Sequence, residues 1–184
     1  VKPSPTAGRI VFDRLATPGP GPFNIDIGTA ERLDLNMNGG DDTVTACVAE
    51  LRKRSEHMMR AHIAKIPDGV YTGEAALDSD GIGPDPLTIR LRLKKKGTDL
   101  YFDFSESSPP CRGPLNSVIA TTKAAVYLAI KHVFPDVPIN AGCFEPLHIA
   151  EPEGTFLYAR YPRPVSGCAA EVSSRGETAV IDRA

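Results

Sequence analysis

The sequence has no tryptophan, no C-x-x-C pair and no long apolar run. A zinc site normally brings at least one close cysteine pair, and disulfide frameworks are uncommon in cytosolic chains. We therefore expect four free thiols, at Cys47, Cys111, Cys143 and Cys168. No apolar stretch approaches the ~20 residues of a bilayer span, and the first residues lack the charged-then-apolar pattern of a signal peptide. These absences favour a cytoplasmic protein.

An excess of positive charge is also missing. The 184 residues carry 21 Lys and Arg against 23 Asp and Glu, a formal net charge of -2. Proteins that bind nucleic acids or membrane surfaces usually show a basic excess, so neither is an expected partner. The phosphate-binding patterns G-x-x-x-x-G-K-[ST] and G-x-G-x-x-G and the nucleophile pattern G-x-S-x-G are absent as well. If nucleotide chemistry is involved, another chain must bind the nucleotide.

Proline and glycine, in contrast, are abundant, with 17 and 16 residues. The segment ATPGPGPFNIDIG (Ala16 to Gly28) holds prolines at alternate positions, which lack an amide donor and fix φ. We predict an extended, proline/glycine-rich arm over residues 1–42, with one short strand near Phe23–Ile27, and a single α+β domain over 43–184. The chain begins with Val rather than Met, which suggests a processed chain or an excerpt of a longer one.

Hydrophobic periodicity predicts two main helices. The first begins at Thr43, shows apolar residues at a 3–4 spacing and ends before Pro67. The second, SVIATTKAAVYLAIKHVF (Ser117 to Phe134), is apolar nearly all round, which indicates burial on most of its surface. Asn116 or Ser117 is its expected N-cap.

Strict alternation of apolar and polar residues predicts a β-hairpin. Its strands are LTIRLRLK and LYFDF, joined by KKKGTD, in which Gly97 can take a positive φ. GVYTGEAAL reads as a further strand, PLHIA and TFLYAR as short extended pieces, and the last 20 residues show no strong period. The predicted fold is therefore α+β: an antiparallel, hairpin-rich sheet packed against two main helices, with the extended N-terminal arm.

Two patterns that resemble metal or ion sites have simpler interpretations. His57 and His62 are five residues apart on the first helix, about 140° around its axis, so they do not face one ligand. Asp78-Ser79-Asp80-Gly81 begins like a calcium loop but lacks the closing Glu, and an Asp/Gly turn explains it better. We predict no metal ligand in this chain.

A basic strip lies on the first hairpin strand and its turn, at Arg90, Arg92, Lys94, Lys95 and Lys96. In a slightly acidic chain, such a strip indicates a solvated strand face or contact with an acidic partner more than nucleic-acid binding.

The strongest local site candidate is FDFSESSPPCRGPLNSV (Phe102 to Val118). Asp103 ends a strand, and serines, Gly113 and Asn116 lead into the buried helix. Polar groups between a strand end and a helix N-terminus can hold an anion, because the first helical amides lack internal partners. The alternative is a connection in which Ser and Asn only cap and turn.

Several segments in fixed order resemble the hydantoinase B/oxoprolinase family. They are SEHMMRAHIAKIPDGVY, LDSDG, DFSESSPPCRGPLNS, VPINAGCFEPLHIAEPEGTFL and YPRPV. Each is weak alone, but together, over about residues 50–180, they are specific. They match only the central part of a B-type component, which is several hundred residues long.

The resemblance implies a subunit or fragment of an ATP-dependent multi-component enzyme that acts on a cyclic amide: a lactam, a hydantoin or oxoproline. A hydantoinase A-like subunit would bind ATP and Mg, which explains the missing phosphate loop, and the remainder of a B-type component would be a further partner. Any divalent metal would bind in a region absent from this chain. We expect the chain to be inactive alone.

The same resemblance selects the candidate site residues. Asp103 is expected to orient a hydroxyl or a water, and Asn116 and Asn140 to donate hydrogen bonds to a carbonyl or phosphorylated oxygen. The candidate substrate-binding residues are Ser105, Gly113, Gly142 and Cys143.

Two alternatives stay open at this point. The chain could belong to an ATP-dependent ketone carboxylase of the acetone or acetophenone type, since no residue separates the two enzymes. It could also be a non-catalytic structural subunit of such a complex.

Overall fold

The computed structural model describes residues 2–3, 9–12, 23–26 and 41–181. They divide into two compact units. The first unit comprises the chain up to Met59 together with Asp136–Glu145, and the second comprises Arg60–Pro135 together with the chain from Pro146 onward. Most of the predicted arm, residues 1–42, lies outside the described residues, and the domain boundary predicted at residue 42 stays a prediction.

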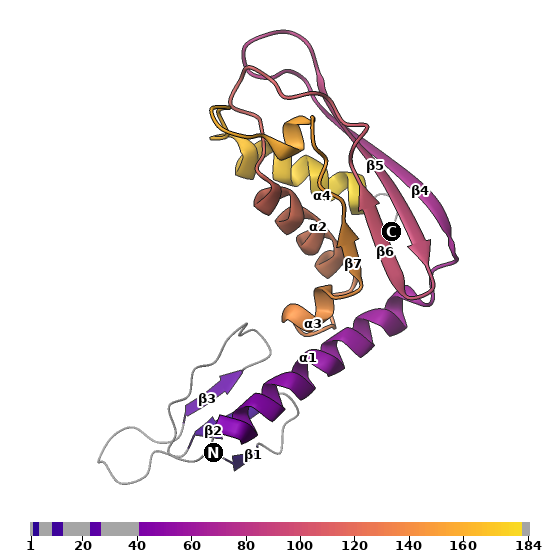
Figure 1. Ribbon diagram of the computed structural model, residues 1–184, viewed down its shortest axis with the longest axis vertical. Helices are drawn as coiled ribbons and strands as arrows, with labels where there is room; N and C mark the ends of the chain where they lie inside the picture. The colour runs from indigo at the N-terminus through magenta and orange to yellow at the C-terminus, as the bar shows by residue number, and fades with distance from the viewer. Residues whose placement is uncertain (1, 4–8, 13–22, 27–40, 182–184) are drawn as a thin grey trace, which may run out of the picture. The chain divides into compact units, whose positions relative to one another are not determined.

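The second unit is built on a four-stranded mixed sheet in the order β4-β5-β6-β7 (Figure 1). Its strands are β4 (Gly69–Leu77), β5 (Leu87–Lys96), β6 (Asp99–Asp103) and β7 (Leu147–Ile149). The first three are antiparallel, and β7 runs parallel to β6. The predicted hairpin is confirmed, with Lys96 opposite Asp99 and Gly97 at φ +63° in the turn.

Alternation along β5 sorts its side chains between two faces. Leu87, Ile89, Leu91 and Leu93 are buried, whereas Arg90, Arg92, Lys94 and Lys96 are exposed. Lys95, which was expected in the basic strip, belongs to the buried face instead, and its Nζ lies 2.7 Å from Asp68 Oδ1. The parity of the strand, with successive side chains on opposite faces, accounts for this correction.

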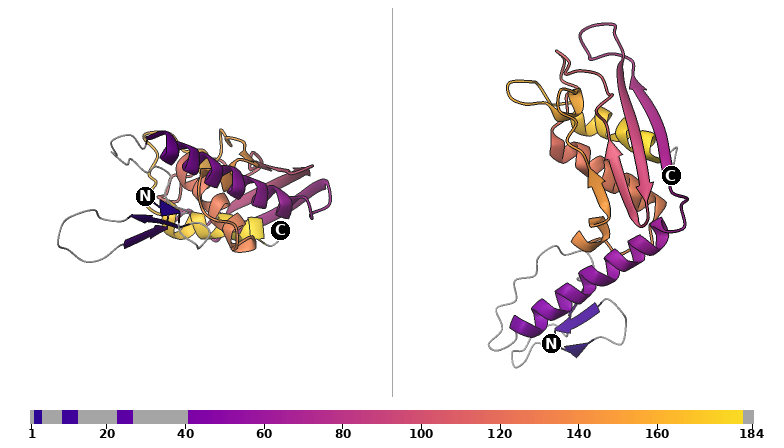
Figure 2. Two further views of the ribbon diagram at one scale, coloured as in Figure 1. Left: turned by 90° about the horizontal axis from the view of Figure 1, so that it is seen from below. Right: turned by 45° about the vertical axis from the view of Figure 1, so that its right-hand side comes forward.

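Two helices cover the buried face of the sheet, α2 (Ile119–Val133) and α4 (Ser173–Ile181), as Figure 1 and the right-hand view of Figure 2 both show. They pack closely because the residues between them are small: a Cβ built on Gly176 would lie 3.8 Å from the Cβ of Ala125. Phe102, Phe104 and Phe156 fill the core with at most 2% exposure. Burying each such side chain stabilises the fold by about 1.5–3 kcal/mol.

The α+β fold class is confirmed, and three local expectations are corrected. α4 was not expected, because its sequence is polar and contains a glycine. The segment TFLYAR forms a 3-10 turn, η2 (Phe156–Tyr158), rather than an extended piece, and a π-helical turn, η3 (Cys168–Val172), precedes α4. Helix α2 begins after Val118, and no side chain caps it, so the predicted N-cap at Asn116 or Ser117 is wrong.

The first unit contains three short antiparallel strands, β1 (Lys2–Pro3), β2 (Arg9–Phe12) and β3 (Phe23–Asp26), which confirms the predicted strand near Phe23. It also contains most of α1 (Asp41–Ile63), which ends in the second unit, and the short helix α3 (Ala141–Phe144). No helix among the described residues is long and apolar enough to cross a membrane.

Candidate functional site

Three family-like segments meet in one loop cluster of the second unit. We use "loop cluster" for Ser79–Gly83, Ser107–Ser117 and Arg160–Gly167. The segments are joined by hydrogen bonds from Gly113 N to the Asp80 carboxylate (3.2 Å) and from Gly167 N to the Pro114 carbonyl (3.0 Å). Segments that are far apart in sequence are thus hydrogen-bonded into one cluster.

Asp80 organises the first loop of this cluster. One carboxylate oxygen accepts hydrogen bonds from Gly83 N (2.8 Å) and Ile82 N (2.9 Å), and these amides hold the pKa of Asp80 below its usual range. A Cβ on Gly113 would lie 1.7 Å from the carbonyl oxygen of Asp80, so only glycine fits there. The turn interpretation of Asp78–Gly81 agrees with this geometry.

Asn116 is buried at the centre of the loop cluster. Its Oδ1 accepts a hydrogen bond from Cys111 N (2.9 Å). Its Nδ2 donates to the carbonyls of Cys111 (3.1 Å), Gly113 (3.0 Å) and Pro164 (3.0 Å). Asn116 is 0% exposed, and both polar atoms of its side-chain amide are hydrogen-bonded to main chain. It therefore holds the loops of the cluster together from the interior of the fold. The predicted contact of Asn116 with substrate stays a prediction.

Cys111 lies beside it and is buried too. Its Sγ donates to the Gly113 carbonyl at 3.4 Å, and burial raises the pKa of the Cys111 thiol. A protonated, buried thiol is a poor nucleophile, so Cys111 has a packing role here.

Two serines tie the segment after β6 to β5. Ser107 Oγ accepts a hydrogen bond from Arg90 N (3.0 Å), and Ser108 Oγ accepts one from Thr88 N (2.9 Å). Ser108 N also donates to the Thr88 carbonyl at 2.9 Å. The serines thereby continue the hydrogen bonding of β5 beyond the last residue of β6, and we call them the serine clamp.

Asp103 and Ser105 come together on the outer face of the sheet. Asp103 Oδ1 accepts a hydrogen bond from Ser105 N at 2.9 Å, and Asp103 stands opposite Arg92 in the β5–β6 register. Asp103 and Ser105 line an open groove of about 460 Å³. Its other charged lining residues are Glu74, Arg90, Arg92 and Glu106. Glu74 and Arg90 form an ion pair at 3.1 Å.

Arg92 was not among the residues expected in the site. Cross-strand register was the signal that could have found it, because the predicted hairpin turn fixes which β5 residue faces Asp103. Among the described residues, the Arg92 guanidinium has no hydrogen-bond or ion-pair partner. It is therefore available to an anionic group in the groove.

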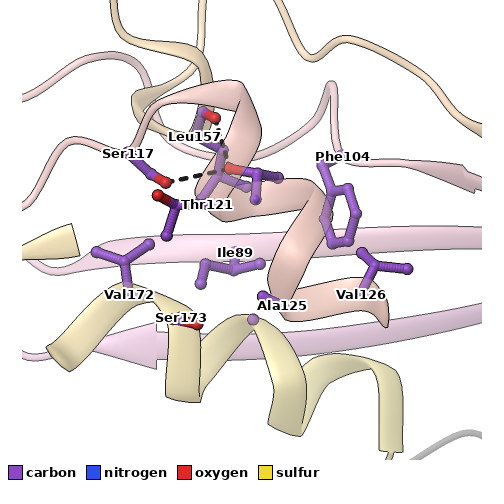
Figure 3. Close-up of a pocket in the computed structure, with 11 residues that line it drawn as sticks. Ile89, Phe104, Ser117, Thr121, Ala125, Val126, Leu157, Val172 and Ser173 are labelled. Carbon is purple, nitrogen blue, oxygen red and sulfur yellow. Dashed lines mark hydrogen bonds between the residues drawn. The ribbon is translucent and has the colours of Figure 1, made fainter. Parts of the chain in front are cut away.

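A second space, between α2, α4 and β5, is too small for a substrate (Figure 3). Its volume is about 10 Å³, which is about one water probe sphere, and apolar residues such as Ile89 and Phe104 line most of it. The hydroxyl of Thr122 donates to the Leu157 carbonyl (2.7 Å) and lies 3.2 Å from that of Ser117, as the dashed lines in Figure 3 mark. These hydroxyls are satisfied within the fold and belong to its core.

The remaining site candidates lie in the first unit. Asn140 caps α3 by accepting a hydrogen bond from Gly142 N (2.9 Å), and its Nδ2 donates to Ser55 Oγ at 2.6 Å. A Cβ on Gly142 would lie 1.9 Å from the carbonyl oxygen of Arg52, so glycine lets α3 approach α1. Cys143 is buried in the same helix. The structure brings Asn140, Gly142 and Cys143 together, in a different unit from Asp103 and Asn116.

The described residues offer no ligand set for a metal, because no three His, Cys, Asp or Glu side chains gather closely enough to hold one. We therefore assign no step to a metal bound by these residues.

Comparison with known proteins agrees with the sequence motifs. The family model described as hydantoinase B/oxoprolinase matches residues 25–183. The putative B component of a D-/L-hydantoinase from Pseudomonas sp. (strain NS671) is 35% identical over 150 residues, covering 75% of this chain and 25% of the relative. The acetophenone carboxylase delta subunit of Aromatoleum aromaticum is 27% identical over 155 residues, covering 80% of this chain and 22% of the relative.

A solved structure supports the same assignment. The crystal structure of the ATP-dependent caprolactamase from Pseudomonas jessenii is similar with a TM-score of 0.67 and 29% sequence identity, covering 78% of this chain and 25% of that one. The chain thus spans about a quarter of the length of these three relatives. It belongs to the hydantoinase B/oxoprolinase family.

Proposed function

We propose that the chain forms part of the substrate compartment of an ATP-dependent, multi-component enzyme that opens a cyclic amide. Family membership supports this, because the relatives include components of a hydantoinase and of a caprolactamase. The observation that carries the proposal is the groove lined by Asp103 and Arg92, which are opposite each other in the β5–β6 register.

In this proposal a partner subunit of the hydantoinase A type binds ATP and Mg and transfers the γ-phosphoryl group to the amide oxygen. A water then attacks the activated carbon, the ring C–N bond breaks with protonation of the nitrogen, and a second water hydrolyses the resulting acyl phosphate to the carboxylate and inorganic phosphate. Asp103 orients the water or a substrate hydroxyl, and Arg92 binds the negatively charged phosphorylated oxygen. Ser105 binds substrate beside them.

The other predicted site residues have two kinds of role in this proposal. The hydrogen bonds of Asn116 and the close contact of Gly113 support a role in holding the loop cluster in place. Asn140, Gly142 and Cys143 stay candidates for substrate contact. The remainder of a B-type component completes the enzyme, the chain alone is inactive, and the cytoplasmic location stays a prediction.

ATP hydrolysis by the complete assembly tests the substrate class. The assembly is given a lactam, a hydantoin or 5-oxoproline in turn, and ADP release is measured against a linear amide as control. Stimulation by one of the cyclic amides is expected. ADP release that rises only with a ketone plus bicarbonate would replace the proposal with the ketone carboxylase, which the similarity to acetophenone carboxylase favours as second candidate.

A purely structural role makes a different prediction in the same assay. If the chain only braces the complex, substitutions in the groove leave stimulated ADP release unchanged, while removal of the chain prevents the assembly from forming.

A further inference from the structure

Three basic side chains on the outer face of the sheet are not paired with the acidic side chains of that face, such as Glu74 and Asp103. Arg92, Lys94 and Lys96 project from this face of β5 at alternate positions. None of these three side chains makes an ion pair or a hydrogen bond within the part of the chain that the structure describes. Their neighbours differ, because Arg90 is paired with Glu74 and Lys95 with Asp68.

Two apolar side chains lie next to these cations on neighbouring strands. In the β4–β5–β6 register, Val70 and Tyr101 stand on either side of Lys94. They are 52% and 41% exposed, respectively, although both are large and apolar. The ring of His148 stacks on Tyr101, with ring centroids 4.6 Å apart. We call Val70, Lys94, Lys96 and Tyr101 the outer patch.

The composition of the outer patch resembles that of a protein interface rather than a nucleic-acid site. Its cations are few and interleaved with apolar groups, and the whole chain has a net charge of -2. Interfaces combine an apolar centre with complementary charges, whereas nucleic-acid sites need a broad basic field. The opposite face of the sheet is already covered by α2 and α4.

We infer that the outer patch docks an acidic surface of another subunit of the assembly. Alternate side chains on a strand are about 6.4–6.8 Å apart, so the partner surface would present carboxylates at that spacing or a multiple of it, next to an apolar contact. Three of the relatives are themselves named as subunits of larger enzymes, so association with other chains is part of how they work. The inference takes a partner subunit from the proposed function but does not depend on the reaction.

Charge reversal of the two lysines tests the inference. The affinity between the complete B-type protein that carries this chain and its A-type partner is measured by titration at about 50 mM and about 500 mM salt, where screening differs strongly. Lys94→Glu/Lys96→Glu is expected to weaken association about tenfold or more at low salt, with a much smaller effect at high salt. Arg175→Glu, which reverses an exposed cation on α4, the helix on the opposite face of the sheet, is the control and is expected to bind as the parent does.

A second variant keeps the inference testable if charge reversal disturbs the fold. Lys94→Gln/Lys96→Gln removes both charges without introducing new ones, and it is expected to weaken association severalfold at low salt. Unchanged affinity of the Gln variant would overturn the inference. So would a loss of thermal stability in the B-type protein alone, because the patch would then contact the same polypeptide.

Binding of a single-stranded oligonucleotide distinguishes a protein-docking patch from a nucleic-acid site. If the parent binds it at physiological salt and the Gln variant does not, the patch serves nucleic acid and the inference fails. The proposed function is tested separately, by ADP release. If the docking prediction fails but cyclic amides still stimulate ADP release, the proposed function is unaffected.

Discussion

The side-chain amide of Asn116 donates a hydrogen bond of 3.0 Å to the carbonyl oxygen of Pro164, which is 48 residues further along the chain. The same two loops are also joined by hydrogen bonds from the Arg163 guanidinium to the Cys111 carbonyl (3.3 Å) and from Gly167 N to the Pro114 carbonyl (3.0 Å). Asn116 Nδ2 also donates to the Cys111 and Gly113 carbonyls. One buried side chain therefore bonds to three carbonyl groups of the loop cluster.

Replacing Asn116 with Ala is expected to destabilise the protein by about 2–4 kcal/mol, because a buried amide donor and buried carbonyls lose their partner. Urea unfolding measures the change. If Asn116→Ala leaves the free energy of unfolding unchanged but abolishes turnover of the complete assembly, Asn116 acts on substrate and its positioning role is wrong.

Gly113→Ala is expected to cost at least about 2 kcal/mol, since its Cβ would overlap the Asp80 carbonyl oxygen at 1.7 Å. Gly83→Ala in the neighbouring loop is the control. Its Cβ would meet nothing closer than 3.8 Å, so its effect should stay within about 0.5 kcal/mol. Equal unfolding midpoints for the two variants would contradict the close approach.

Asp103→Asn is expected to lower kcat of the complete assembly about 10²–10⁴-fold while leaving stability nearly unchanged. The neutral side chain can still accept the hydrogen bond from Ser105 N, so the loop keeps its shape, but it no longer orients a water as a base does. Asp85→Asn, at an exposed position outside the groove, is the control for the loss of a carboxylate. Full turnover of Asp103→Asn would remove Asp103 from the proposed site.

Acid should loosen the loop cluster through Asp80. The amides of Gly83 and Ile82 lower the pKa of Asp80 in the folded state, so its carboxylate contributes stability above the unfolded value of about 3.9. That contribution is lost as pH falls through the lower folded pKa. Urea midpoints measured between about pH 7 and pH 3 should fall less steeply for Asp80→Asn than for the parent. Parallel curves would contradict this linkage.

The strands of the second unit could be predicted because their signals are local. Alternation along β5 and β6 specifies which side chains are buried, and Gly97 marks the turn that fixes the register. The helix α4 could not be predicted in this way. Its sequence is polar, and its packing depends on small residues of α2 that lie about 50 positions earlier.

The candidate site was only partly accessible to sequence reasoning. Asp103 and Ser105 are neighbours in sequence, and their shared groove follows from strand geometry. The contacts of Gly113 with Asp80 and of Asn116 with Pro164 span 33 and 48 residues, so no local pattern reveals them. The motif residues were recognised as a set. Which of them face a ligand, and which hold the loop cluster together, depends on the tertiary fold.

The serine clamp has a consequence for association between molecules. Beyond the end of β6, β5 would present unpaired amides and carbonyls, which can recruit a strand from another chain and start aggregation. Ser107 Oγ and Ser108 Oγ accept hydrogen bonds from the amides of Arg90 and Thr88, and Ser108 N donates to the Thr88 carbonyl, so these groups are not free to pair with a further strand. The sheet is therefore closed to strand addition at the position where its own pairing stops, next to the groove that must stay open.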